Sequence, residues 1–139
     1  MSLRKPTIFI ALLIFTSAHL SVAQAVSYKV SVELAILSKE TYADDEAQAT
    51  EWCTLGVNEY KIAKGDPIKF KNESGKTVGI GKLSKAFAIE DEGSFYCGYT
   101  ATVTVGAAKF YSVTIDGREG PDYSFAELKK KKWKVSLYL

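Results

Sequence analysis

The sequence has a single histidine, two cysteines and three prolines among its 139 residues. The histidine, His19, lies in an N-terminal segment that we predict to be removed, so residues 24–139 contain none. Its absence excludes nucleophilic catalysis by a Ser–His or Cys–His pair and metal ligation by histidine. A membrane-spanning run is also missing, because the apolar stretch at residues 8–15 is far shorter than the about 20 residues a spanning helix needs.

The N-terminus has the layout of a secretory signal peptide. Two basic residues, Arg4 and Lys5, precede the apolar run, and the small-residue stretch "TSAHLSVAQA" follows it. We therefore predict a signal peptide at residues 1–23 and one secreted domain at residues 24–139, located outside the cell or in its envelope. A short membrane anchor is the alternative for the first segment.

Charge is evenly balanced in the predicted domain. The whole sequence carries a net charge of +2, and Arg4 and Lys5 account for it, so residues 24–139 are neutral overall. A nucleic-acid-binding protein usually needs a strong positive field, and this balance argues against a nucleic-acid ligand.

The two cysteines, Cys53 and Cys97, predict one disulfide, as is usual for an even pair in an exported protein. The bond would close a long loop, for which the loss of chain entropy in the unfolded state corresponds to roughly 4 kcal/mol. The alternative, a reactive thiolate, has no histidine to activate it.

Several segments alternate apolar and polar residues with a period of two, which is typical of half-buried strands. The clearest is Phe95–Val105, in which Cys97 lies on the apolar face. The turn residues Asn72–Gly75 predict a hairpin between two further strands. The predicted strands are residues 26–37, 67–71, 76–83, 86–89, 95–105, 109–115 and 133–139.

Two segments favour helix. Ser124 and Glu127 have the spacing of a capping box, which predicts one or two helical turns before the last strand. The acidic segment at residues 38–52 can form a long loop or a short helix. Together these elements predict an all-β fold: a single antiparallel β-sandwich with one short C-terminal helix before the last strand and one disulfide.

Lysines crowd the end of the predicted C-terminal helix. They suit the negative end of the helix dipole as ordinary solvated surface, and they can also bind an anionic polymer or a membrane surface. Arg118, in the predicted glycine-flanked loop 116–122, is a further candidate, with a salt bridge to a neighbouring acid as the alternative. The candidate anion-binding residues are Lys129, Lys130, Lys131, Lys132, Lys134 and Arg118.

Other motifs give no specific chemistry. The stretch "SGKTVGIGKL" lacks the glycine that a phosphate loop requires five places before Gly75, so its glycines are better explained by a strand that bends or approaches a neighbour. The acidic residues at 44–51 lack EF-hand spacing, and an irregular calcium site there stays open. Asn72 begins an N-glycosylation signal but is equally explained by the turn. No metal or cofactor is predicted.

Several short motifs follow one another between Cys53 and Leu139. They are C-x-x-G at 53–56, Ile62 with Gly65, "SGKTVGIGKL", Cys97, "KFYSVTI" followed by Arg118, and "YSFAELKKKKWKVSLYL" at 123–139. In this pattern the stretch resembles a group of small exported bacterial proteins, common in actinobacteria, that have no assigned activity. The resemblance implies a compact β-domain held by a Cys53–Cys97 bond. In that group an acidic pair often precedes the isoleucine, whereas Tyr60-Lys61 stands here, which argues against a metal role.

A weaker likeness, in "GDPIKFKNESGKTVGIG", is to transthyretin-like and carboxypeptidase regulatory β-sandwiches, which are non-catalytic accessories. The sequence therefore predicts a secreted, non-enzymatic β-sandwich that acts through its surface on an envelope component or a protein partner. Two alternatives stay open: a binder of an anionic polymer through the lysines, and a small hydrolase that uses two carboxylates across a cleft.

Overall fold

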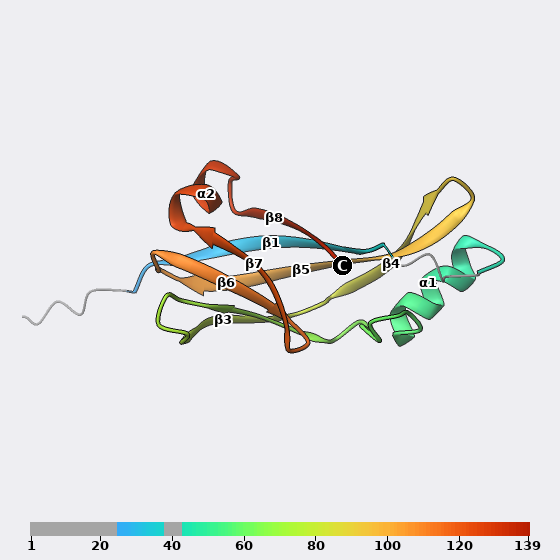
Figure 1. Ribbon diagram of the computed structural model, residues 1–139, viewed down its shortest axis with the longest axis horizontal. Helices are drawn as coiled ribbons and strands as arrows, with labels where there is room; N and C mark the ends of the chain where they lie inside the picture. Colours follow the sequence, from blue (N-terminus) through green and yellow to red (C-terminus); the bar gives the residue numbers. More distant parts are fainter. Residues whose placement is uncertain (1–24, 38–42) are drawn as a thin grey trace, which may run out of the picture.

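A computed structural model describes residues 25–37 and 43–139 of the protein, and the predicted signal peptide lies outside them. Two four-stranded sheets form a sandwich, with a short helix at each end (Figure 1). Sheet A has the strand order β4 (Lys85–Asp91), β5 (Ser94–Gly106), β1 (Ser27–Ile36) and β8 (Lys134–Tyr138). Sheet B has the order β3 (Thr77–Lys82), β2 (Pro67–Lys71), β6 (Phe110–Ile115) and β7 (Arg118–Ser124). The predicted β-sandwich is confirmed.

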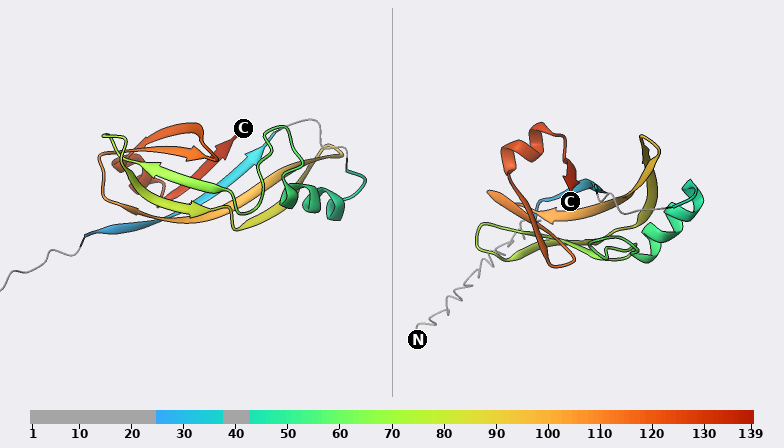
Figure 2. Two further views of the ribbon diagram at one scale, coloured as in Figure 1. Left: turned by 90° about the horizontal axis from the view of Figure 1, so that it is seen from below. Right: turned by 45° about the vertical axis from the view of Figure 1, so that its right-hand side comes forward.

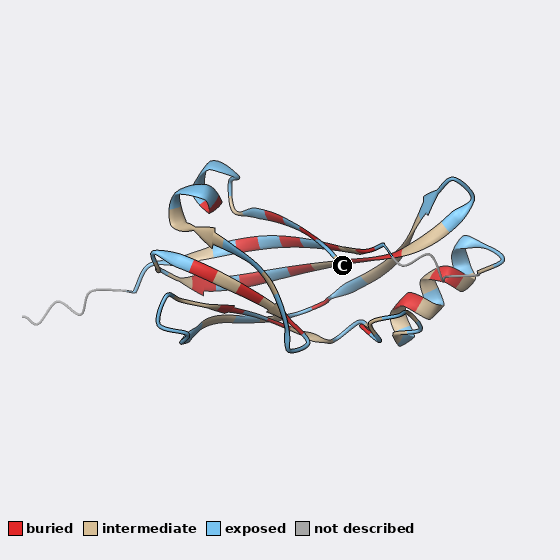
Figure 3. Cartoon of the chain, in the orientation of Figure 1, coloured by how far each residue is buried: buried red, intermediate tan, exposed pale blue. Residues whose placement is uncertain are grey.

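The core lies between the sheets and is formed by apolar side chains of both. Buried and exposed residues alternate along several strands (Figure 3). Every second residue of β1 from Val30 to Ile36 is buried, and β5 buries Cys97, Tyr99 and the alternate residues that follow. β1 and β5 pair antiparallel over their whole common length, with Val30 opposite Val103. The predicted faces of both strands are therefore correct, because a period of two sends one set of side chains inward.

One pairing differs from the antiparallel prediction: β8 runs parallel to β1, with Val32 opposite Val135. The cause is the route of the chain. β7 belongs to sheet B and ends beside α2 (Phe125–Lys130), and the chain then crosses to sheet A at the end of the molecule where β1 also begins. Parallel strands require such a crossover rather than a tight hairpin.

The predicted loop at residues 116–122 is wrong, because most of it forms β7. Asp116 and Gly117 make a two-residue turn in which both backbones are left-handed, with φ of 46° and 77°. This conformation matches the twist of a β-hairpin, and Asp-Gly is a strong sequence signal for it. Arg118 is therefore the first residue of a strand and faces Ile115 across the hairpin.

The acidic segment before Cys53 contains a helix, α1 (Glu46–Leu55). Of the two alternatives that the sequence left open, a long loop or a short helix, the structure has the helix. The Asp45 side chain caps it by accepting a hydrogen bond from the amide of Gln48 at 2.8 Å. α1 lies against β4 at the opposite end of the molecule from α2 (Figures 1 and 2). There the amide of Ala88 donates to the Thr50 hydroxyl at 3.2 Å, which joins the two elements.

Candidate functional site

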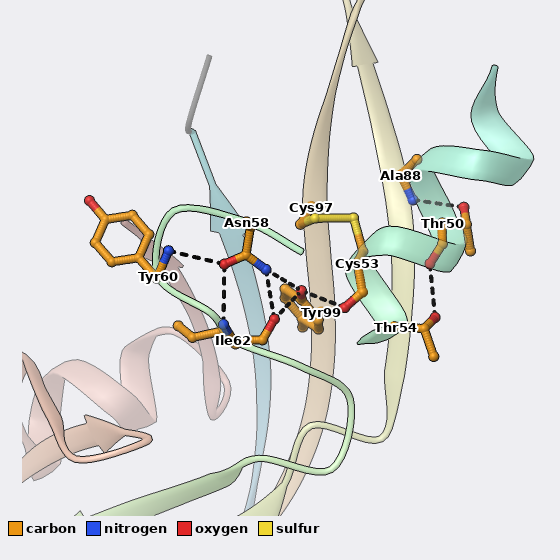
Figure 4. Close-up of a disulfide and its surroundings, with 9 residues drawn as sticks. All are labelled: Thr50, Cys53, Thr54, Asn58, Tyr60, Ile62, Ala88, Cys97 and Tyr99. Carbon is orange, nitrogen blue, oxygen red and sulfur yellow. Dashed lines mark hydrogen bonds between the residues drawn. A yellow bond between two sulfur atoms is a disulfide. The ribbon is translucent and has the colours of Figure 1, made fainter. Parts of the chain in front are cut away.

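The two cysteines have a structural role. Cys53 of α1 and Cys97 of β5 form a disulfide, and both are fully buried (Figure 4). Beside them the hydroxyl oxygen of Tyr99 lies 2.8 and 2.7 Å from the carbonyl oxygens of Cys53 and Ile62, which share its single hydrogen, and burial raises the pKa of this phenol. Asn58 donates to the same hydroxyl at 3.2 Å. No free thiol is present in the described residues. The disulfide and the hydrogen bonds of Tyr99 therefore have a structural role, which is to hold α1 against β5 of sheet A.

α2 begins with the predicted capping box. The amide of Glu127 donates to the hydroxyl of Ser124 at 3.1 Å, and the amide of Ser124 donates to the carboxylate of Glu127 at 2.6 Å. The backbone hydrogen bond from Ser124 lowers the pKa of Glu127. The helix start is thus fixed by local chemistry, and it places the following lysines at the helix end.

α2 ends in a Schellman motif whose left-handed position is a lysine. The amide of Trp133 donates to the carbonyl of Leu128 at 2.8 Å, and the amide of Lys132 donates to that of Lys129 at 3.0 Å. Lys132 has φ of 54°, in the left-handed region where helices usually place glycine. Trp133, at φ of 60°, then stacks on Tyr28 of β1 with ring centroids 4.2 Å apart.

Replacing Lys132 by glycine is therefore expected to stabilise the protein by about 0.5–1 kcal/mol, because glycine adopts this backbone without steric cost. Urea denaturation measures the change. Lys131→Gly is the matched control: Lys131 has φ of −78°, so glycine there only adds chain entropy and should destabilise the protein by about 0.5–1 kcal/mol. Equal effects at the two positions would contradict the assignment of strain to Lys132.

The fold adds a lysine from β1 to the predicted lysine cluster at α2 and β8. Ser31 of β1 pairs with Lys134, and Lys29 lies two residues earlier on the same outer face of sheet A. Six exposed lysines therefore share one end of the molecule. We call this surface the basic pole: Lys29, Lys129, Lys130, Lys131, Lys132 and Lys134.

Acidic residues gather at the other end. They lie around α1 and on the turn between β4 and β5, which are neighbours in space (Figure 1). All of them are exposed. We call this surface the acidic pole: Asp44, Asp45, Glu46, Glu51, Glu90, Asp91 and Glu92. Because this surface lies far from α2, part of the charge is segregated between the two ends of the molecule, and a neutral total does not argue against a local anion-binding site.

Arg118 does not join the basic pole. It starts β7, whereas α2 follows the far end of that strand. Its guanidinium lies 3.6 Å from the carboxylate of Asp116, in a pair whose side chains are 41% and 43% exposed, and 5.6 Å from the ring centre of Tyr60. The salt-bridge alternative is thus confirmed, and the predicted anion-binding set divides into a lysine cluster and a separate paired arginine.

A groove that the sequence did not predict lies on the outer face of sheet B. Lys69 and Lys71 of β2 stand on one side of it, and Glu119 and Asp122 of β7 on the other. Its main section has a volume of about 580 Å³. The sequence signal was Gly120-Pro121 within an otherwise extended segment, a pattern typical of a β-bulge.

The fold adds no support for the other candidate sites that the sequence left open, the calcium site and the glycosylation signal. Within residues 25–37 and 43–139, no group of three acidic, cysteine or histidine residues is placed to hold a metal ion, including the acidic segment at 44–51. Asn72 lies in the β2–β3 turn, where its side-chain oxygen accepts hydrogen bonds from the amides of Ser74 and Lys76 at 3.0 and 2.9 Å. No helix in this part of the chain is long and apolar enough to cross a membrane.

No family model, curated protein or solved structure matches this chain. The resemblance to small exported bacterial proteins therefore stays a prediction. What can be said of function has to come from the surfaces described above.

Proposed function

We propose that the protein is an extracytoplasmic, non-enzymatic binding module that holds an anionic polymer or surface through its basic pole. The observation that carries the proposal is the segregation of charge: six exposed lysines gather around α2 and the start of β8, and the acidic pole lies at the far end. Such a molecule approaches a polyanion with its lysines forward, because the acidic pole is distant and the carboxylate within α2, Glu127, is outnumbered by the lysines around it.

The strained backbone at Lys132 supports a functional role for the charge. Glycine would be more stable at that position, and a residue that breaks a local rule is expected where function requires it. Within the described residues no carboxylate lies within ion-pair distance of a basic-pole lysine, so these cations are available to a ligand.

Three observations support binding without catalysis. Residues 24–139 contain no histidine, and both cysteines are consumed in the disulfide. The three carboxylates that line the groove, Glu73, Glu119 and Asp122, are all exposed. A carboxyl that serves as a general acid near neutral pH normally sits in apolar surroundings that keep it protonated. The disulfide in turn supports an oxidising compartment.

The test is salt-dependent binding to a polyanion. On immobilised heparin, the logarithm of the binding constant should fall with the logarithm of salt concentration with a slope of about −4 to −5. The triple variant Lys129→Gln/Lys131→Gln/Lys134→Gln should reduce the magnitude of that slope by about two. The matched control, Lys69→Gln/Lys71→Gln/Lys76→Gln, removes the same charge from sheet B and its hairpin and should change the slope by less than about one.

Vesicles containing anionic phospholipid distinguish a membrane surface from a polymer. If the membrane is the target, the triple variant should bind vesicles about 100-fold more weakly, since each lysine near such a surface contributes about 1 kcal/mol. Equal binding of the basic-pole variant and the control variant, or binding that does not change with salt, would contradict the proposal.

A further inference from the structure

The groove of sheet B is assembled by an irregularity in β7. Glu119 and Asp122 are three residues apart, so in a regular strand their side chains would face opposite sides of the sheet. The register shifts between Ser112 and Thr114, and the extra residue lets Asp122 pair with Ser112 while Glu119 pairs with Thr114. Since Ser112 and Thr114 flank the buried Val113, both acidic residues lie on the outer face.

Glycine suits this bulge. A Cβ atom at Gly120 would lie 3.1 Å from the carbonyl oxygen of Val113, a tight contact that the backbone would have to relieve by a small shift. β2 and β3 carry a second irregularity, between Phe70 and Lys71, on the opposite flank of the groove. Bulges bend and twist strands and are enriched beside binding sites, so two of them around one groove indicate a shaped surface rather than a flat sheet face.

One end of the groove is held rigid. The β2–β3 turn is closed by the Asn72 side chain, and the next residue, Glu73, accepts a hydrogen bond from the amide of Lys109 at 3.2 Å. Hydrogen bonds from its own amide and from that of Lys109 lower the pKa of Glu73. Phe110 follows directly, and its side chain lines the groove while 55% exposed. Because the backbone beside this exposed ring is held by hydrogen bonds, less of the chain has to be ordered when a ligand binds.

The charges of the groove define what it can accept. Lys69 and Lys71 are separated from Glu119 and Asp122 by β6, and the single ion pair within residues 25–37 and 43–139 joins Arg118 to Asp116. The lysine donors and carboxylate acceptors of the groove are therefore free to bond a ligand. A polyanion would be repelled by the carboxylates and a polycation by the lysines.

We propose that this groove binds a short segment of an uncharged oligosaccharide. Sugar hydroxyls both donate and accept hydrogen bonds, so they can accept from Lys71, donate to Asp122 and bond the Ser112 hydroxyl between them. The apolar face of a sugar ring can lie on Phe110. The volume of about 580 Å³ is within the range of small-molecule sites. This site is separate from the basic pole and does not depend on it.

Titration calorimetry against cellohexaose, xylohexaose, mannohexaose, laminarihexaose and chitohexaose tests the inference. At least one should bind with a dissociation constant below about 1 mM. Raising the salt to about 0.5 M should change that constant less than about twofold, because the ligand is uncharged. The basic-pole triple variant should bind it as the wild-type protein does, which keeps this result independent of the polyanion test.

Phe110→Ala should weaken binding about tenfold through loss of ring stacking. Ile80→Ala is the matched control. Ile80 is 63% exposed on β3, the edge strand of the same sheet, outside the groove lining, and its truncation should have no effect. Asp122→Asn, which keeps a hydrogen-bonding side chain, should weaken binding less than Asp122→Ala.

Three results would overturn the inference: no binding of any of these sugars at about 5 mM, binding that Phe110→Ala leaves unchanged, or binding only of a charged oligosaccharide such as polygalacturonate. Amide chemical shifts provide a second readout that does not depend on affinity. On addition of the bound sugar they should move at Lys71, Ser112 and Asp122 and stay constant at Lys130 and Lys134.

Discussion

Replacing Cys53 and Cys97 together by alanine is expected to lower the free energy of unfolding by about 4 kcal/mol. The bond closes a loop with a sequence separation of 44, and opening it restores conformational entropy to the unfolded chain. Alanine is the suitable replacement, because both positions are fully buried and a serine hydroxyl there would need a new partner. With a urea m value of about 2 kcal/mol/M, the unfolding midpoint should fall by about 2 M.

A control separates loss of the cross-link from loss of the two side chains. Wild-type protein unfolded and refolded under a thiol reductant keeps both cysteines but lacks the bond, and it should show most of the decrease. α1 should then be the first element to lose amide protection, since the bond fastens it to β5 and only non-covalent contacts, such as the Tyr99–Cys53 and Ala88–Thr50 hydrogen bonds, would remain. A decrease below about 1 kcal/mol in both experiments would mean that the bond constrains neither state appreciably.

Gly79→Ala is expected to destabilise the protein by about 2–3 kcal/mol through overpacking. An added Cβ atom would lie 2.7 Å from the carbonyl oxygen of Thr104 and 2.7 Å from Cγ1 of Val105, both in β5. The carbonyl cannot move aside easily, because Thr104 pairs with Lys29 in the central ladder of sheet A. The glycines of β3 therefore allow the two sheets to approach closely at this edge, as the sequence had suggested in general terms.

Gly106→Ala is the matched control for this substitution. Gly106 ends β5, has an ordinary backbone conformation, and an added Cβ atom there would meet its nearest neighbours at 3.8 and 3.9 Å. The change should be neutral or stabilise the protein by up to about 1 kcal/mol, because alanine loses less entropy than glycine on folding. Thermal or urea denaturation compares the two variants. A similar decrease in the free energy of unfolding in both variants would contradict the argument that Gly79 is needed for the close approach of β3 to β5.

The sequence by itself determined the local features of this protein. Alternation of apolar residues located β1 and β5 and their buried faces, Ser124 and Glu127 identified the start of α2, and the presence of only two cysteines left a single possible pairing. Each of these features depends on residues close together in the chain or on a count, so pattern and composition were sufficient.

Only the tertiary structure decided how distant segments meet. The parallel direction of β8 depends on where the crossover from sheet B returns to sheet A, and no local pattern encodes that route. The bulge that turns Glu119 and Asp122 to one face depends on their pairing with β6. The separation into a basic and an acidic pole likewise arises because folding brings β1 beside β8 and α1 beside β4, which a net charge summed over the sequence cannot express.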